Sequence, residues 1–362
     1  MTKTKIMTGK INTLFDLFLI ILGSVIGCVL TFISSGHLQR STLKTLAKSE
    51  TPVHSLRQQQ HEVVTTEADR LAKEARILCW ILTYPGAHDT KAVHLKNTWG
   101  KRCDKLIFMS TKENTSLGAV ALNVSEGFYN LWGKTKEALK YVYNHHLEEY
   151  DWFLKADVDT YTIMENLRYM LSSYDPNFPI YFGSRLRKFF KEGFLGGGSG
   201  YVMSRETLRK FVEKALPNKS SCTDGERGLE DVELAKCLLQ IGVLIGDSRD
   251  SSGRGRFFPL GAGTHILGEI PQWYKEIAFY KPHVGFNGCS DSAIGFHKIS
   301  PELMYWYEFL LYHVRAYGIR HQQPFPAPLP PDRESIPEEI LHRYDILRNL
   351  TQNVNIENVH IE

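Results

Sequence analysis

The stretch Asp151-Trp-Phe-Leu-Lys-Ala-Asp157-Val-Asp159-Thr-Tyr161 decides the fold class of this chain. Its apolar, aromatic first half is typical of a buried strand, which stops at two carboxylates spaced i, i+2. On an extended backbone these positions share one face, so Asp157 and Asp159 can converge on one hard divalent cation. Such cations take oxygen ligands, including phosphate oxygens. The pattern predicts a metal and diphosphate site at the crevice of an open α/β sheet; a solvated turn is the alternative, because aspartate favours turns.

Apolar runs and segments of helical periodicity alternate around this stretch. The strand-like runs lie at 77–83, 105–110, 180–183 and 200–203, and the helical segments lie at 91–102, 128–147, 206–214 and 228–240. This alternation predicts an α/β fold with a mostly parallel central sheet and helices on both faces.

Composition limits the class of protein further. The chain has 362 residues, 43% hydrophobic and 23% charged, which are globular values. A net charge of +3 does not indicate a basic surface for binding nucleic acid.

Residues 14–33 are apolar with one charge, Asp16, and have the length of one membrane-spanning helix. A cleaved signal peptide with Ser34-Ser35-Gly36 as its cleavage site is the alternative. Three basic residues on each side leave the orientation open.

Sequons and cysteines favour a lumenal location for the rest of the chain. Cys79 and Cys103 flank one short stretch and Cys222 and Cys237 another, so two local disulfides, or else buried thiols, fit the spacing. Sequons for N-glycosylation lie at Asn114, Asn123, Asn218 and Asn349. We therefore expect a single-pass membrane protein with a cytosolic tail at 1–13, a transmembrane signal anchor at 14–34, a lumenal stem at 35–75, a catalytic domain at 76–323 and a Pro-rich, charged extension at 324–362.

Three further segments hold candidate chemistry. Glu230 and Asp231 open a predicted helix, where a carboxylate serves as a cap or, if it faces a cleft, as a general base. His297 is a candidate third metal ligand, with an ordinary core histidine as the alternative. Residues 196–200 are glycine-rich without the phosphate-loop pattern, so we expect close backbone approach to a ligand or a bend before a strand. Trp273 lies in an aromatic segment that either stacks on a sugar or packs in the core.

These residues together resemble the core 1 β1,3-galactosyltransferases, the animal enzymes that add galactose to O-linked N-acetylgalactosamine. The resemblance runs from about residue 76 to 323. It rests on ordered blocks that include Arg76-Ile-Leu-Cys-Trp, Asp151-Trp-Phe-Leu-Lys-Ala-Asp-x-Asp-Thr-Tyr161, Ile180-Tyr-Phe-Gly, Glu230-Asp231, Gly246-Asp-Ser-Arg-Asp250 and Phe296-His297.

The resemblance implies a GT-A fold, UDP-galactose as donor, a GalNAc-O-Ser/Thr glycoprotein as acceptor, Mn²⁺ and inversion at the anomeric carbon. It places Asp157, Asp159 and His297 at the metal, Asp231 as base and Trp273 at the acceptor. The positions that it implies for UDP are Leu82, Glu126, Gly127, Lys134, Asp157, His297 and Lys298. It pairs Cys79 with Cys103 and Cys222 with Cys237. It also implies a Golgi membrane protein of type II and is compatible with a homodimer.

The chain departs from the family pattern at four places. Val158 stands between the two aspartates where the family has a third acidic residue, and Gly288 precedes Cys289 where many members have two cysteines. Phe128 and Lys298 replace an arginine and a tyrosine that touch the nucleotide. A diverged paralogue that uses another UDP-sugar is therefore the first alternative. A non-catalytic, chaperone-like relative is the second, and an anchored adhesion or lectin-like protein, which needs no carboxylate trio, is the third.

Overall fold

The computed structural model describes residues 66–220, 222–314 and 316–317. The predicted cytosolic tail and anchor, most of the predicted stem, the extension at 324–362 and the Asn349 sequon lie outside these residues. Among the residues that are described, no helix has the length and apolar character needed to cross a membrane.

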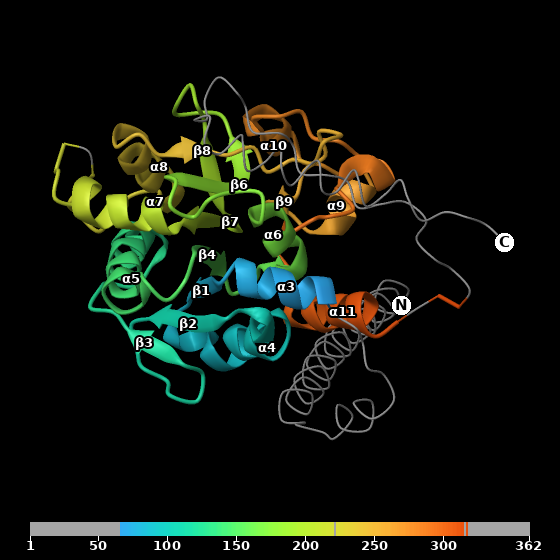
Figure 1. Ribbon diagram of the computed structural model, residues 1–362, viewed down its shortest axis with the longest axis horizontal. Helices are drawn as coiled ribbons and strands as arrows, with labels where there is room; N and C mark the ends of the chain where they lie inside the picture. Colours follow the sequence, from blue (N-terminus) through green and yellow to red (C-terminus); the bar gives the residue numbers. More distant parts are fainter. Residues whose placement is uncertain (1–65, 221, 315, 318–362) are drawn as a thin grey trace, which may run out of the picture. The chain divides into compact units, whose positions relative to one another are not determined.

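A seven-stranded sheet forms the centre of the fold, in the order β3-β2-β1-β4-β7-β6-β8 (Figure 1). Its strands are β1 (Ile77–Leu82), β2 (Lys105–Ser110), β3 (Ala119–Ala121), β4 (Trp152–Asp157), β6 (Ile180–Leu186), β7 (Phe194–Ser204) and β8 (Leu244–Ile245). The pairings of β1 with β2 and β4, of β2 with β3 and of β6 with β8 are parallel. Only β7 runs against its neighbours, β4 and β6. The prediction of an α/β fold with a mostly parallel central sheet is thus confirmed.

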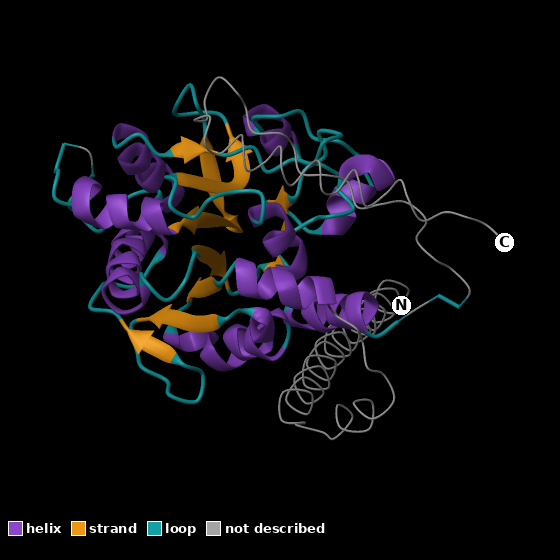
Figure 2. Cartoon of the chain, in the orientation of Figure 1, coloured by secondary structure: helices purple, strands orange, loops and turns teal. Residues whose placement is uncertain are grey.

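Helices cover both faces of this sheet (Figures 1 and 2). They are α3 (Thr66–Glu74), α4 (Val93–Asn97), α5 (Leu131–His146), α6 (Met164–Leu171), α7 (Arg205–Lys210), α8 (Glu230–Gln240), α9 (Ala262–Ile266), α10 (Gln272–Ile277) and α11 (Pro301–Tyr312). All six residues of β1 are buried, and alternate ones enter two separate cores. Ile77 and Ile81 face the core that holds Leu167 of α6, whereas Leu78 and Trp80 face the core of α5, α7 and α8.

A small second sheet completes the edge of the domain. It contains β5 (Tyr161–Thr162), β10 (Gly295–Phe296) and β9 (Phe257–Phe258), in the order β5-β10-β9. Tyr161 pairs with Phe296 in the antiparallel contact of β5 with β10. Because β5 follows the Asp157–Asp159 turn by one residue, this pairing brings a segment about 140 residues later in the chain to the end of β4.

The predicted helix at 91–102 is divided into three short turns. A π-helical turn, His88–Ala92, precedes α4, and a 3-10 turn, Trp99–Arg102, follows it. The break falls at Thr98, whose φ of −111° and ψ of −115° are not helical. Its hydroxyl donates to the carbonyl of His94 at 2.8 Å, a local bond that competes with helix continuation.

The glycine-rich segment 196–200 lies inside β7 rather than before a strand, so the predicted start of this strand at residue 200 was six residues too late. Glycine is a weak strand former, so the sequence pattern did not indicate a strand over this segment. Gly200 has a φ of +83°, a left-handed conformation that favours glycine. A register shift against β6 falls between Gly183 and Ser184.

The end of the predicted stem packs on the domain. Residues 66–74 form α3, and α3 contacts α6. Leu71 and Ala75 are buried, and Ala75 belongs to the same core as Ile77. The buried packing therefore begins before residue 76, where the predicted catalytic domain starts.

Candidate functional site

Two aspartates and one histidine converge at the carboxyl end of β4. Asp157 ends β4, Asp159 lies in the turn that follows, and His297 directly follows β10. His297 Nε2 lies 3.4 Å from Asp159 Oδ1 and 4.0 Å from Asp157 Oδ2. All three side chains are half-buried, and one ligand atom of each lies within 4.8 Å of the others. Two carboxylate oxygens and an imidazole nitrogen suit a divalent cation, so the residues present fit a metal.

The Asp159 carboxyl is held in its charged form. Burial by itself would raise its pKa, but hydrogen bonding to His297 and the charges of His297 and Lys91 outweigh burial and lower it. Lys91 Nζ lies 4.0 Å from Asp159 Oδ2. A carboxylate that stays ionised is available as a metal ligand over a wide pH range.

A buried lysine links this cluster to β7. Lys155 lies in β4 with its side chain only 3% exposed, and its Nζ is 2.7 Å from Asp157 Oδ1. The same ammonium donates to the carbonyl of Gly197 at 3.0 Å and lies 3.9 Å from Glu230 Oε2. Because Lys155 occupies Oδ1 of Asp157, the other oxygen, Oδ2, is the one that faces His297.

The glycines of β7 make room for these side chains. A Cβ on Gly197 would lie 2.7 Å from Glu230 Oε2 and 3.2 Å from Lys155 Nζ. A Cβ on Gly198 would overlap the imidazole ring of His297. The backbone of this segment therefore comes close to the side chains of the candidate site, and its expected approach to a ligand stays a prediction.

Asp231 and Glu230 lie in the first turn of α8 and occupy different environments. Asp231 Oδ2 accepts the backbone N–H of Gly197 at 3.2 Å, and its Oδ1 accepts that of Val232 at 3.0 Å. Glu230 is buried, and its Oε1 accepts the hydroxyls of Tyr201 at 2.7 Å and Thr135 at 3.2 Å. Leu229, not a carboxylate, is the N-cap residue. The half-buried Asp231, rather than the enclosed Glu230, is thus the better candidate for contact with a substrate.

Burial raises the pKa of Asp231, and the Gly197 N–H and the Lys155 charge offset this only in part. Burial also raises the pKa of Glu230, although Lys155 acts in the opposite direction. A raised pKa makes a carboxylate a better proton acceptor, because its pKa then lies closer to the working pH.

The residues expected at the nucleotide lie along the end of β1. Leu82 is the register partner of Asp157, which places the last residue of β1 beside the metal cluster. Lys134 is buried in α5 and donates from Nζ to the carbonyl of Thr83 at 2.9 Å and to Glu126 Oε2 at 2.7 Å. Glu126, Lys134 and the end of β1 are therefore brought together.

Gly127, Phe128 and Lys298 are exposed positions near these elements. Gly127 has a φ of +123°, and Lys298 has a φ of +59°, the only positive φ among the described non-glycine residues. Phe128, which begins the 3-10 turn before α5, is 68% exposed. Its ring meets Tyr129 edge-on at 5.5 Å. Two aromatic rings in solvent at this place are available to a planar ligand.

Trp273 lies on α10 and is 45% exposed. A chain of aromatic contacts joins it to the cluster: its ring lies 5.7 Å from that of Tyr274, Tyr274 meets His265 at 5.9 Å, and His265 meets Phe258 at 4.7 Å. The carbonyl of Phe258 in turn accepts the backbone N–H of His297 at 3.0 Å. Trp273 therefore does not lie in the core, and its support is continuous with the backbone of His297.

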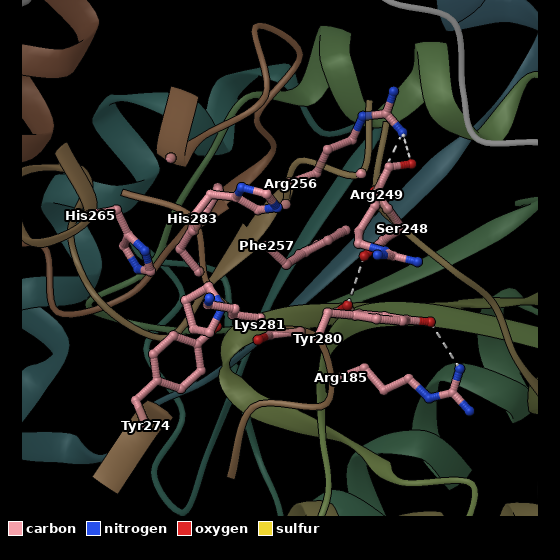
Figure 3. A pocket seen from close by; sticks show the side chains of 17 residues that line it. Arg185, Ser248, Arg249, Arg256, Phe257, His265, Tyr274, Tyr280, Lys281 and His283 are labelled. Carbon is pink, nitrogen blue, oxygen red and sulfur yellow. Dashed lines mark hydrogen bonds between the residues drawn. The ribbon is translucent and has the colours of Figure 1, made fainter. Parts of the chain in front are cut away.

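His265 and Tyr274 of this aromatic chain line a small cavity of about 60 Å³ (Figure 3). Tyr274, Tyr280 and the side chains of several basic residues line it, and the hydroxyl of Tyr280 accepts Arg185 Nη1 at 3.2 Å. Asp157, Asp159 and Asp231 are not among its lining residues. The cavity is thus separate from the carboxylate cluster.

Both predicted disulfides are present. Cys79 is bonded to Cys103, and Cys222 is bonded to Cys237. Cys289 is the free cysteine of the described residues, and burial raises the pKa of its thiol to about 11.

Of the sequons within the described residues, Asn123 and Asn218 are exposed and Asn114 is half-buried. Asn114 accepts Ser116 Oγ at 2.7 Å through its Oδ1. Their glycosylation stays a prediction.

Sequence reasoning missed Lys155 as a site residue, although it stands in the most informative stretch of the chain. A lysine inside an otherwise apolar, buried strand was the available signal, because a buried ammonium requires a charged or polar partner. It also missed Lys91 and Tyr201, whose roles depend on contacts between distant elements.

Comparison with known proteins gives the class. A family model described as Fringe-like matches residues 73–249. A glycoprotein-N-acetylgalactosamine 3-beta-galactosyltransferase 1 of Xenopus laevis is 40% identical over 274 residues, which cover 75% of each chain. A beta-1,3-glucosyltransferase of Mus musculus is 26% identical over 49% of this chain and 36% of its own. A chondroitin sulfate synthase 3 of Homo sapiens is 27% identical over 42% of this chain and 19% of its own.

The chain is therefore a glycosyltransferase with a Fringe-like domain. Its likeness to the Xenopus enzyme is high and extends over three quarters of both chains. It belongs to the core 1 β1,3-galactosyltransferase family, as its sequence blocks predict.

Proposed function

We propose that this chain transfers galactose from UDP-galactose to O-linked N-acetylgalactosamine on glycoproteins, forming a β1,3 linkage with inversion and requiring Mn²⁺. The observation that carries the proposal is the arrangement of Asp157, Asp159 and His297 beside Asp231, joined through Lys155 and Gly197. The name of the Xenopus relative supports the sugar, the linkage and the acceptor.

Asp157, Asp159 and His297 would hold the metal. When bound, Mn²⁺ supplies charge neutralisation for the diphosphate leaving group, a Lewis-acid contribution of several kcal/mol. Lys155 keeps one oxygen of Asp157 occupied, and Gly198 keeps the His297 ring in place by leaving it space. These two residues therefore set the direction in which the ligand atoms point.

Asp231 acts as the general base. As the acceptor hydroxyl oxygen bonds to the anomeric carbon of galactose, its proton passes to an oxygen of Asp231, and the bond from that carbon to the diphosphate oxygen breaks. Attack opposite the leaving group inverts the anomeric carbon. The raised pKa of Asp231 suits it to accept this proton.

The donor and the acceptor would lie on opposite sides of this centre. Leu82, Glu126, Gly127, Lys134 and Lys298 would contact UDP, together with Asp157 and His297. Trp273 would stack its exposed ring on the acceptor sugar, because a sugar presents an apolar face to an aromatic ring.

We further propose that the chain is a type II Golgi membrane protein with its catalytic domain in the lumen. A homodimer is compatible with this arrangement.

A second candidate function is transfer from another UDP-sugar. The exposed Phe128 and the left-handed Lys298 favour it, since both stand where the family uses different side chains toward the nucleotide. A non-catalytic role is less well supported, because the carboxylate and imidazole side chains converge with the spacing that a metal needs.

A donor and acceptor panel on the purified full chain tests the proposal. UDP-galactose, UDP-glucose and UDP-N-acetylglucosamine would each be offered with a GalNAc-O-peptide, in Mn²⁺ or in chelator. We expect galactose transfer in Mn²⁺ alone. A preference for another donor would replace the proposal by the second candidate, and a lack of transfer from every donor would support the non-catalytic role.

A further inference from the structure

The helix α11 carries a continuous apolar stripe that faces solvent. Leu303, Trp306 and Leu310 recur at i, i+3 and i+7 of α11, the spacing of one helix face, and Val314 follows the end of the helix at Tyr312. All four are exposed, Trp306 to 59% and Leu310 to 56%, and the flanking Phe309 and Leu311 are about half exposed.

The opposite side of α11 is already used for packing. Met304 is buried in the core, and Glu308 forms an ion pair with Arg102 at 2.5 Å. Tyr312 donates its hydroxyl to Glu165 Oε2 at 2.7 Å. The helix is therefore apolar on its outer face and fixed on its inner face, and helices of this kind are covered on both sides.

The sequence that follows the described residues contains a matching stripe. Ile336, Ile340, Tyr344, Leu347 and Val354 recur at i, i+4, i+8, i+11 and i+18, which predicts the mostly apolar face of an amphipathic helix. Arg343 and Thr351 are the polar residues on the same face. Ser335 and Glu338 have the spacing of a capping box, and Pro337 suits a first helical turn. The opposite face would carry polar residues: Glu338, His342, Asp345, Asn349 and Gln352.

We propose that residues 336–354 dock as an amphipathic helix on the apolar stripe of α11 in the same chain. The connection permits it. A 12-residue helix is about 18 Å long, and residues 318–335, which include a Pro-rich run, would reach well beyond that distance at about 3 Å per residue. The sequon Asn349 would face away from α11, which leaves it open to a glycan.

Two other occupants fit the stripe less well. A second copy of the chain would need about 800 Å² per partner for a stable interface. A helix about 18 Å long and about 10 Å wide offers far less. A tethered segment meets no such requirement, because its effective concentration is high. A membrane surface favours helices with Lys and Arg on the polar face, and α11 contains Glu302 and Glu308 but no Lys or Arg.

Amide hydrogen exchange of α11 in the full chain, held in lipid nanodiscs, tests the proposal. We expect the amides of residues 303–312 to exchange roughly 10-fold faster in a chain that ends at residue 335 than in the full chain. A full-length variant with Ile340→Asp and Leu347→Asp should show the same increase, which guards against an effect of truncation on folding.

The matched control is a full-length variant with His342→Asp and Gln352→Asp. It adds two acidic side chains on the polar face, and we expect its α11 exchange to equal that of the unaltered chain. Equal exchange in the full and shortened chains would overturn the proposal. So would protection that rises with protein concentration, which indicates a second copy, or with the lipid-to-protein ratio, which indicates the membrane.

Discussion

Lys155 Nζ lies 2.7 Å from Asp157 Oδ1, so a buried ammonium holds one oxygen of a candidate metal ligand. The same ammonium donates to the carbonyl of Gly197, and the N–H of Gly197 donates to Asp231. One residue of β7, Gly197, therefore connects the candidate metal cluster to the candidate base. A shift of this strand would move both the metal cluster and the base. This explains the glycines at 197 and 198, where a side chain would displace the residues of the site.

Replacement of Asp231 by asparagine separates the roles of base and of structural acceptor. Asn keeps the shape and one acceptor oxygen, but it cannot take the proton of the acceptor hydroxyl. We expect Asp231→Asn to lower the turnover number by about 10²–10⁴-fold while UDP affinity remains. Turnover and UDP binding would be measured on the same folded variant. Near-normal turnover would move the base elsewhere, with Glu230 as the first candidate.

The pH dependence of activity follows from the raised pKa of Asp231. Burial keeps this carboxyl protonated at pH values where an ordinary aspartate, with a pKa of about 3.9, is ionised. A protonated base is inactive, so kcat/KM should rise with pH through a value above that of a free aspartate. The profile would be recorded at saturating Mn²⁺. The residual activity of Asp231→Asn should lack this limb, and its persistence there would assign the limb to another group.

Gly198→Ala tests the support of His297. The added Cβ overlaps the imidazole ring, so the ring must leave its place beside Asp159. We expect Mn²⁺ affinity to fall by about 10–100-fold, as for the loss of groups that orient metal ligands. Gly263→Ala is the matched control, because a Cβ there meets nothing within 4 Å. Equal Mn²⁺ affinity in the two variants would show that His297 does not need this position.

The disulfide between Cys79 and Cys103 should contribute to stability. Cys79 and Cys103 close a loop with a sequence separation of 24, which corresponds to about 3 kcal/mol in the chain-entropy model. We expect the double replacement by alanine to lower the free energy of unfolding by about this amount, measured by denaturant titration. Cys289→Ala serves as the comparison, since Cys289 is free. A mass map of the unreduced chain with free thiols at Cys79 and Cys103 would contradict the pairing.

The strands around Asp157 could be predicted from sequence because their residues are apolar and lie close together in the chain. Asp157 and Asp159 stand in one such stretch, so their approach depends on local geometry. The place of His297 depends on the pairing of β5 with β10, which no local pattern specifies. The local sequence left His297 open between a metal ligand and an ordinary core histidine, and the resemblance favoured the ligand.

Local sequence patterns did not predict two features, the full length of β7 and the role of Lys155, for different reasons. The antiparallel β7 was partly hidden because its glycines have low strand propensity, and they are there to admit Lys155 and His297. Lys155 stood in the predicted strand, but its partners Gly197 and Glu230 come from β7 and α8. Its role therefore depends on the tertiary fold.

Mn²⁺ binding and galactose transfer, measured together on the full chain and on Asp159→Ala, test the central claim most directly. Asp224→Ala, which alters an exposed aspartate outside the cluster, is the control. We predict that the unaltered chain and the control bind Mn²⁺ and lose transfer in chelator. Asp159→Ala should lose metal affinity and at least about 10³-fold in rate, since the metal contributes several kcal/mol. Near-normal transfer by Asp159→Ala in chelator would contradict the account.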